Sequence, residues 1–169
     1  MAVIEKFLGQ RVEIPEDRKY YPKQGLWAKP EPDGMIFGFT EPALVLAGGV
    51  NDLDWLVGDN VPVRQGQDVV FAITGKILYI DTPLQGIISF NPELKQNLSL
   101  TAEDPYGEGW LFRIEPDDAM AEAGQTAIDA LGYAECLKGT DGLKNPEGIK
   151  GGVSGICKAV YSGISGQKI

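Results

Sequence analysis

The sequence contains no histidine and only two cysteines among its 169 residues. Without histidine, no imidazole is present to act as the base of a catalytic triad, which excludes histidine-dependent enzymes. The cysteines, Cys136 and Cys157, lie 21 positions apart. Zinc sites need ligands at paired short spacings, and small secreted domains need a denser disulfide framework. We therefore expect neither a zinc site nor a disulfide-dense secreted scaffold.

Basic residues are also scarce. The 15 lysine and arginine residues are outnumbered by 24 aspartate and glutamate residues, so the net charge is −9. Affinity for nucleic acid comes largely from clustered basic side chains, and no basic stripe is present, so we expect no nucleic-acid partner. The acidity favours solubility or attraction to a positively charged partner surface, and net charge does not choose between the two.

Long apolar runs are absent as well. Nowhere do 18 apolar residues follow one another, and residues 1–8 contain no apolar stretch of signal-peptide length. These absences predict a cytoplasmic protein that does not enter a membrane.

Glycine, by contrast, is abundant, with 22 residues, and the apolar residues occur in short runs between turn-forming residues. This composition indicates a mostly β protein with many tight turns, and the length suits one core. We expect residues 1–19 to form a loosely packed, polar lead-in. Residues 139–169 hold eight of the glycines and are predicted to form a flexible extension with little core of its own.

Turn signals divide the chain into short predicted elements. A turn at 30–34, rich in proline and glycine, joins two strands into a hairpin, and Thr40 followed by Pro42 predicts a helix start. Pro62 predicts that its strand lies at a sheet edge, because proline cannot donate to an inner ladder. The predicted elements are strands at 26–29, 35–39, 61–63, 69–73, 77–80, 87–90 and 110–114, and helices at 40–47 and 116–137.

Lys76 follows Thr74 and Gly75 between two apolar, β-rich runs and is therefore predicted at a hairpin tip. A primary amine at such a tip is accessible to an acylating enzyme and, once amidated, forms a long tether. Most hairpin lysines are merely solvated, so the turn alone does not establish a function. The chain has no evident pair of nucleophile and base, and we do not expect catalysis by the protein alone.

Three blocks of sequence together resemble the H-protein of the glycine cleavage system, over about residues 20–138. The most specific is the run Asp-Pro-Tyr-Gly-Glu-Gly-Trp at 104–110, and the others are the opening hairpin and the segment 127–137. This resemblance implies a mostly β, lipoyl/biotinyl-type hammerhead fold, a barrel-sandwich hybrid, with a short helix after the first hairpin and a C-terminal helix. It also implies a non-catalytic carrier with lipoate attached to Lys76, Gly75 in the turn, and a lipoate-attaching ligase as a partner.

The sequence departs from the family pattern around this lysine. Ile73-Thr74-Gly75 precedes Lys76 where the family usually has Glu-Ser-Val, and Lys76 lies 10 positions before Gly86, one fewer than in the family. Gln24-Gly25-Leu26 also replaces an acidic residue before the tryptophan. With the extension beyond Gly139, these departures resemble the lipoate-binding H-protein-like carriers of sulfur-oxidising prokaryotes. We therefore favour sulfur intermediates as the cargo and a heterodisulfide-reductase-like complex as the partner.

Two alternatives stay open. The first is an H-protein of the glycine cleavage system that carries the aminomethyl group between P-, T- and L-type proteins. The second, of another class, is an unlipoylated binding module. A biotinyl carrier is disfavoured because biotin sites favour methionine on both sides of the lysine, where Gly75 and Ile77 stand.

Cys136 and Cys157 admit three roles. They are unpaired thiols without a function, with Cys136 packed on its helix as a small apolar residue, or they form a disulfide, or they act as redox thiols that exchange with a nearby dithiolane. The reducing cytosol disfavours a stable disulfide.

Overall fold

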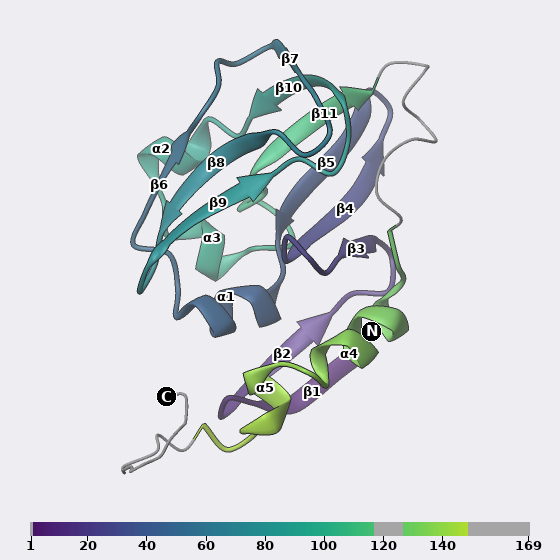
Figure 1. Cartoon of the computed structure of the whole chain (residues 1–169), viewed down its shortest axis with the longest axis vertical. Helices are drawn as coiled ribbons and strands as arrows, with labels where there is room; N and C mark the ends of the chain where they lie inside the picture. Colours follow the sequence, from purple (N-terminus) through teal and green to yellow (C-terminus); the bar gives the residue numbers. More distant parts are fainter. Residues whose placement is uncertain (1, 117–126, 149–169) are drawn as a thin grey trace.

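The computed structural model of the chain describes residues 2–116 and 127–148. The described part is mostly β, which confirms the fold class predicted from the sequence (Figure 1). Its strands are β1 (Ala2–Phe7), β2 (Gln10–Ile14), β3 (Lys19–Tyr21), β4 (Leu26–Glu31), β5 (Gly34–Phe39), β6 (Asp52–Trp55), β7 (Val61–Val63), β8 (Asp68–Ile73), β9 (Ile77–Asp81), β10 (Gly86–Phe90) and β11 (Phe112–Pro116). Its helices are α1 (Glu41–Ala47), α2 (Glu93–Gln96), α3 (Leu100–Glu103), α4 (Ala130–Leu137) and α5 (Asp141–Lys144).

Two antiparallel sheets enclose the main core. One has six strands in the order β3-β4-β5-β11-β10-β7, and the other has three in the order β6-β8-β9. Their apolar faces meet in one cluster of buried side chains, to which the larger sheet contributes Phe37, Ile88 and Phe112 and the smaller one Val70 and Ala72. Each of these sheets has two ends in the described part of the chain, so neither closes into a barrel.

The first hairpin and the first helix form where the local turn chemistry predicts them. β4 and β5 pair from one end of the hairpin to the other, and β7, which contains Pro62, lies at an edge of the six-stranded sheet. α1 begins after Thr40, whose hydroxyl accepts a hydrogen bond from the Ala43 amide, and ends at Gly48 in the left-handed conformation. These predictions are confirmed because each depends on a backbone preference of the residues themselves.

Trp27 on β4 faces away from the main core and joins a second one. Its ring is fully buried and packs on Gly38, where a side-chain carbon would come within 2.7 Å of the indole. Its Nε1 donates a hydrogen bond to the Pro105 carbonyl (2.8 Å). The Arg18 guanidinium lies over the ring, 4.6 Å from its centroid. The tryptophan therefore ties the first hairpin to the turn-rich segment around Pro105.

The N-terminal segment is not loosely packed, and that prediction is wrong. Residues 2–14 form the two-stranded hairpin of β1 and β2, in which Phe7, Val12 and Ile14 are buried. These side chains form the second core together with Trp27 and the buried face of α4. The alternation of Val12 and Ile14 with charged neighbours is the period-two pattern of a half-buried strand.

The C-terminal helix is shorter than predicted. Apolar spacing predicts a helix over 116–137, but β11 extends to the start of this range and α4 begins only after Asp129. Ile128 instead exchanges two backbone hydrogen bonds with Tyr20 (2.8 and 2.9 Å), and the Asp129 carboxylate caps the helix. Strand pairing and the cap thus outweigh the helical spacing. Residues 117–126 lie outside the described part of the chain.

The first residues of the C-terminal extension pack on the N-terminal hairpin. α5 contacts β1, and Leu143 packs against the second core. The prediction that 139–169 has little core is therefore wrong for residues 139–148, while residues 149–169 lie outside the described part. This packing gives β1 a hydrophobic partner that the hairpin alone would lack.

Gly142 of α5 lies directly against the Phe7 ring, and an added Cβ would fall 2.2 Å from a ring carbon. We expect Gly142→Ala to lower the free energy of unfolding by about 1–3 kcal/mol, because the buried ring has no space into which to move. The measurement is urea denaturation. Gly139→Ala is the matched control, since its nearest contact would be at 3.9 Å. Equal stabilities for the two variants would contradict this packing.

Three tyrosines gather at the second core. The rings of Tyr20 and Tyr133 stack with centroids 4.9 Å apart, and the hydroxyls of Tyr133 and Thr40 share a hydrogen bond (2.6 Å). The Tyr106 hydroxyl accepts a hydrogen bond from the Glu41 amide (3.0 Å). Burial raises the pKa of Tyr133 to about 12 and raises the pKa of Tyr20 and Tyr106 above the ordinary value.

A buried tyrosine whose pKa is raised stays protonated in the folded chain at a pH at which the unfolded chain has already lost the proton. The stabilisation of the folded chain is complete below about pH 10, the ordinary tyrosine pKa, and is lost as the pH rises toward the folded-state pKa. We expect the free energy of unfolding to fall above pH 10 by about 1.4 kcal/mol per pH unit for each such tyrosine. Tyr133→Phe should make this slope shallower in urea titrations at pH 9 to 11. The control is Tyr79→Phe, at a ring that is 60% exposed, and an equal change in both variants would contradict the assignment.

Candidate functional site

Lys76 lies in the turn between β8 and β9, where the sequence predicts it. Figure 1 shows the hairpin that these two strands form. Ile73 of β8 pairs with Ile77 of β9, so the turn consists of Thr74, Gly75 and Lys76. Gly75 and Lys76 are both exposed. The ε-amine is therefore presented at the end of a paired two-stranded unit.

The backbone of Lys76 is held by Thr74. The Thr74 amide donates to the Lys76 carbonyl (2.8 Å), and the Lys76 amide donates to the Thr74 hydroxyl (3.2 Å). Thr74 is itself buried, with 6% of its surface exposed. The start of the lysine side chain is thus fixed, while its amine remains in solvent.

Asn51 supports the same turn from the neighbouring segment. Its amide donates to the Ile73 carbonyl (2.7 Å), and its side-chain Nδ2 donates to the Thr74 carbonyl (3.3 Å). Sequence reasoning missed both Asn51 and the role of Thr74. The signal for Thr74 was a hydroxyl residue inside a turn, where such side chains bond to nearby backbone groups. Asn51 has no comparable signal, because it reaches the turn only through the pairing of β6 with β8.

Gly75 has no steric reason to be glycine in the folded chain. A side-chain carbon placed there would meet no atom within 4 Å, and its φ is not positive. The turn position predicted for Gly75 is observed, but the turn itself does not require glycine. Its smallness leaves open space beside Lys76.

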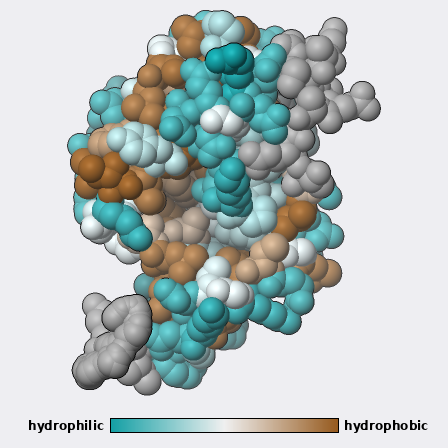
Figure 2. Space-filling view, in the orientation of Figure 1, coloured by the Kyte–Doolittle hydropathy of each residue, from teal (hydrophilic) through white to brown (hydrophobic). Residues whose placement is uncertain are grey.

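Two apolar side chains next to the lysine are exposed. Ile77 is 57% exposed and Tyr79 is 60% exposed, and they lie on the same face of β9. The Tyr79 ring packs beside Phe71 of β8, with centroids 5.6 Å apart. Figure 2 also shows hydrophobic surface on the side of the molecule formed by β6 and this hairpin. Contiguous exposed apolar side chains are typical of contact surfaces, and these lie beside Lys76.

Carboxylates flank this face. Asp54 on β6 forms an ion pair with Lys95 (2.5 Å), whose hydrogen bond holds the pKa of Asp54 below its usual range. Asp81 at the end of β9 accepts a hydrogen bond from Gln24 Nε2 (3.2 Å), which joins the segment before β4 to the hairpin. Gln24 Oε1 is buried and has no hydrogen-bond partner among the described residues.

The described residues contain no cluster of three or more side chains that could hold a metal ion. Across the same residues, no helix is long and apolar enough to cross a membrane. The arrangement around Lys76 presents an amine on a fixed support.

Cys136 lies exposed on α4, so it does not pack as a small apolar residue and that prediction is wrong. The apolar positions of the helix that face the core are Ala130, Tyr133 and Leu137. Cys157 lies outside the described residues. A disulfide between the two thiols, and their exchange with a dithiolane, stay predictions.

Comparison with known proteins identifies relatives of this chain. The family model described as glycine cleavage H-protein matches residues 18–139. The chain is 36% identical over 130 residues to the glycine cleavage system H protein of Thermus thermophilus, an alignment that covers 75% of this chain and 98% of that protein. It is 34% identical over 133 residues to glycine cleavage system H protein 5 of Aquifex aeolicus, covering 75% and 88%. The crystal structure of a glycine cleavage system H protein from Mycobacterium marinum matches with a TM-score of 0.59 and 27% identity, covering 73% of this chain and 98% of that one.

The hydrogen bonds from Thr74 generate a prediction about the turn. Thr74→Val keeps the shape of the side chain but removes the hydroxyl that binds the Lys76 amide, and one such bond contributes about 1 kcal/mol. We expect hydrogen exchange of the Lys76 amide to accelerate roughly fivefold, measured by NMR, while overall stability changes less than local opening. Thr74→Ser keeps the hydroxyl and should exchange like the parent. Equal acceleration in both variants would show that packing, and not the hydroxyl, holds the turn.

Proposed function

Because this chain belongs to the glycine cleavage H-protein family, whose members are carriers that hold lipoate covalently on a lysine, we propose that Lys76 is its lipoyl-bearing lysine. The observation that carries this proposal is the placement of an exposed lysine in a turn whose backbone is held by Thr74 and Asn51. Lys76 is also the one lysine in the hairpin segment 68–81. The chain is a carrier and not an enzyme.

The residues present fit a long acyl group on this amine. The space beside Gly75 is open, and the exposed face of β9 leaves the amine accessible to a ligase. When bound, lipoate supplies a dithiolane whose disulfide can be reduced, can accept a fragment and can be reoxidised by exchange. The chain itself contributes a fixed origin for the arm, so that its end can visit several active sites.

We propose the aminomethyl group as the cargo, with the P-, T- and L-type proteins of the glycine cleavage system as partners. The family match and the names of the relatives support this cargo. They give no support to sulfur intermediates or to a heterodisulfide-reductase-like partner, so the cargo favoured from the sequence is corrected. A cytoplasmic location stays a prediction.

Several of the departures that suggested sulfur have structural explanations, although Gly75 has none. Thr74, which precedes the lysine in place of the family's usual residues, holds the turn with its hydroxyl. Gln24, in the segment that lacks the usual acidic residue, donates to Asp81. Part of the extension beyond Gly139 builds the second core through α5. None of these roles requires a different cargo.

Lipoylation of Lys76 is tested by expressing the full chain with lipoate and a lipoate ligase, followed by intact mass and peptide mapping over residues 69–83. We expect the mass of one lipoyl group on Lys76 and its complete loss in Lys76→Arg, which keeps the charge but cannot form the amide. Lys23→Arg is the control at another exposed lysine and should retain the group. An unmodified Lys76 with every ligase would favour the unlipoylated binding module instead.

The cargo is tested with the lipoylated chain and glycine decarboxylase. We expect glycine-dependent exchange of labelled bicarbonate, with Lys76→Arg at background. Lipoylated protein that fails in this exchange but accepts sulfur from a thiosulfate-oxidising reconstitution would overturn the aminomethyl assignment while leaving the carrier assignment in place.

A further inference from the structure

Residues outside the family match build a unit of their own against the carrier domain. The match ends at residue 139 and begins at residue 18, so β1, β2 and α5 lie beyond it. They are joined by backbone hydrogen bonds from the Leu8 amide to the Gly142 carbonyl (3.1 Å) and from the Gly9 amide to the Pro146 carbonyl (2.7 Å). An ion pair between Lys6 and Glu147 (2.8 Å) adds to them.

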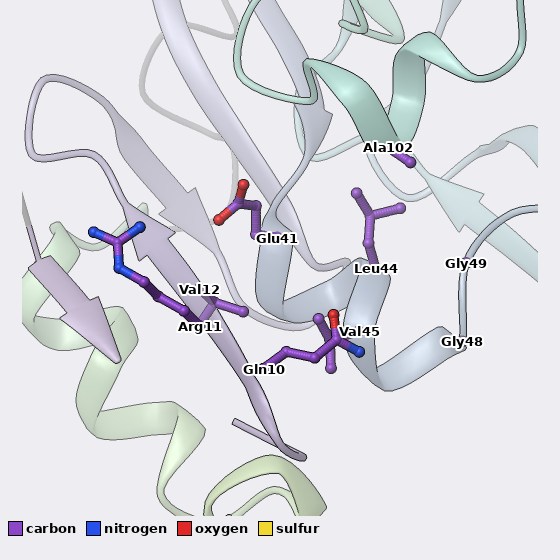
Figure 3. Close-up of a pocket in the computed structure, with 9 residues that line it drawn as sticks. All are labelled: Gln10, Arg11, Val12, Glu41, Leu44, Val45, Gly48, Gly49 and Ala102. Atoms are coloured by element: carbon purple, nitrogen blue, oxygen red, sulfur yellow. The ribbon is translucent and has the colours of Figure 1, made fainter. Parts of the chain in front are cut away.

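A groove of about 370 Å³ lies between this unit and the carrier domain (Figure 3). One wall is β2 and the other is α1 with the residues that follow it, and α3 contributes at one end. Six of its nine lining residues are apolar or glycine: Val12, Leu44, Val45, Gly48, Gly49 and Ala102. Figure 2 shows hydrophobic surface at the level of α1, between the sheets and the unit below them.

An acidic hollow adjoins the groove at Glu41, whose carboxylate accepts a hydrogen bond from the Glu13 amide (2.7 Å). Glu41 lines both the apolar groove and a second hollow of about 580 Å³. Residues 13–18 and 103–106 form the rest of the second hollow's lining, apart from residue 14. The carboxylate residues that line the second hollow are Glu13, Glu16, Asp17, Glu41, Glu103 and Asp104. The basic residue in its lining, Arg18, is nearly buried and already binds Asp17 and the Tyr106 carbonyl.

The described chain ends beside the mouth of this groove. At Gly148 a side-chain carbon would lie 2.5 Å from the Leu8 carbonyl oxygen and 3.1 Å from the Gly9 amide nitrogen. The next residue of the N-terminal hairpin, Gln10, is the first that lines the groove. Gly148 therefore lies near the end of the groove that Gln10 lines.

The sequence that follows complements the groove in charge. Residues 149–169 contain Lys150, Lys158 and Lys168, and no arginine or acidic residue. The net charge of −9 for the whole chain therefore corresponds to +3 for this segment and −12 for residues 1–148. Between the lysines lie apolar residues that suit the walls of the groove: Val153, Ile156, Val160, Tyr161 and Ile164.

We propose that the chain's own C-terminal segment, residues 149–169, docks in this groove. Its apolar residues contact the β2–α1 walls, and Lys158 and Lys168 lie toward the acidic hollow. The distance allows it, because the seven steps from Gln10 to Asp17 span at most about 25 Å and the ten residues from Gly148 to Lys158 reach about 33 Å when extended. A second copy of the chain would bring its own net charge of −9 to an acidic surface, which disfavours it as the occupant.

Cys157 allows a direct test on the full chain. In a Cys136→Ser background, a nitroxide is attached to Cys157 and paramagnetic broadening of amide NMR signals is measured. We expect strong broadening at Val12, Leu44 and Ala102 along the groove and none on β7, which lies at the opposite end of the molecule from β1 and β2 (Figure 1). Added salt should weaken the effect, because exposed charges are screened.

Paired variants separate charge from fold. Glu103→Lys in the acidic hollow should reduce the broadening at Ala102 at least as much as salt does, whereas Glu93→Lys on α2, another exposed site that lies outside the groove, should not. Lys158→Glu with Lys168→Glu should abolish the broadening, and the two lysines changed to arginine should preserve it. Three outcomes would each overturn the proposal. The broadening could be uniform over the molecule, it could be unchanged in Glu103→Lys, or it could occur in a mixture in which the nitroxide and the NMR isotope are on different chains. The last outcome would identify a second copy as the occupant.

Discussion

The structure depends on the first half of strand β4, residues 26–28, being buried on both faces. Leu26 and Ala28 point into the main core between the two larger sheets, and Trp27 between them points into the second core. Gly38 on the paired strand provides the space that the indole needs, and the Pro105 carbonyl accepts from its nitrogen. A strand segment that is buried on both faces cannot shift its register by one residue without exchanging its two sets of buried side chains. The pairing of β4 therefore fixes how the N-terminal hairpin and the carrier domain are joined.

The same rigidity reaches the lysine by a different path. The three-stranded sheet packs through Leu53, Val70 and Ala72 on the main core, so the hairpin that ends in Lys76 is anchored along its length. Hydrogen bonds from Thr74 then fix the last backbone groups before the side chain. A carrier arm with a fixed origin explores a smaller volume than one on a mobile loop, which raises its effective concentration at each active site. A rigid hairpin and a mobile side chain are thus compatible in one carrier.

The sequence predicts those parts of the fold that depend on local backbone chemistry. The turn at 30–34, the cap at Thr40 and the hairpin containing Lys76 could each be found because their residues prefer those conformations wherever they occur. The burial of the β1–β2 hairpin and the pairing of Ile128 before α4 could not, because both result from contacts between segments distant in sequence, although the alternation at Val12 and Ile14 is itself a strand signal. Ile128 lies in a segment whose apolar spacing predicts a helix, but its backbone pairs with Tyr20, more than a hundred residues away. The role of Asn51 could not be predicted either, because it depends on the pairing of β6 with β8.

The residues around Lys76 also explain why the sequence favours a cargo that the family match does not support. A residue that differs from the family pattern indicates a different chemistry only if the fold does not require that residue. Thr74 and Gln24 both have hydrogen bonds that serve the carrier's own structure. By contrast, Ile77 and Tyr79 are exposed, and the buried core gains little from them. Adaptation of this carrier to its enzymes is therefore to be sought in the exposed residues beside the lysine, Gly75, Ile77 and Tyr79, because Thr74 is constrained by its hydrogen bonds in the turn.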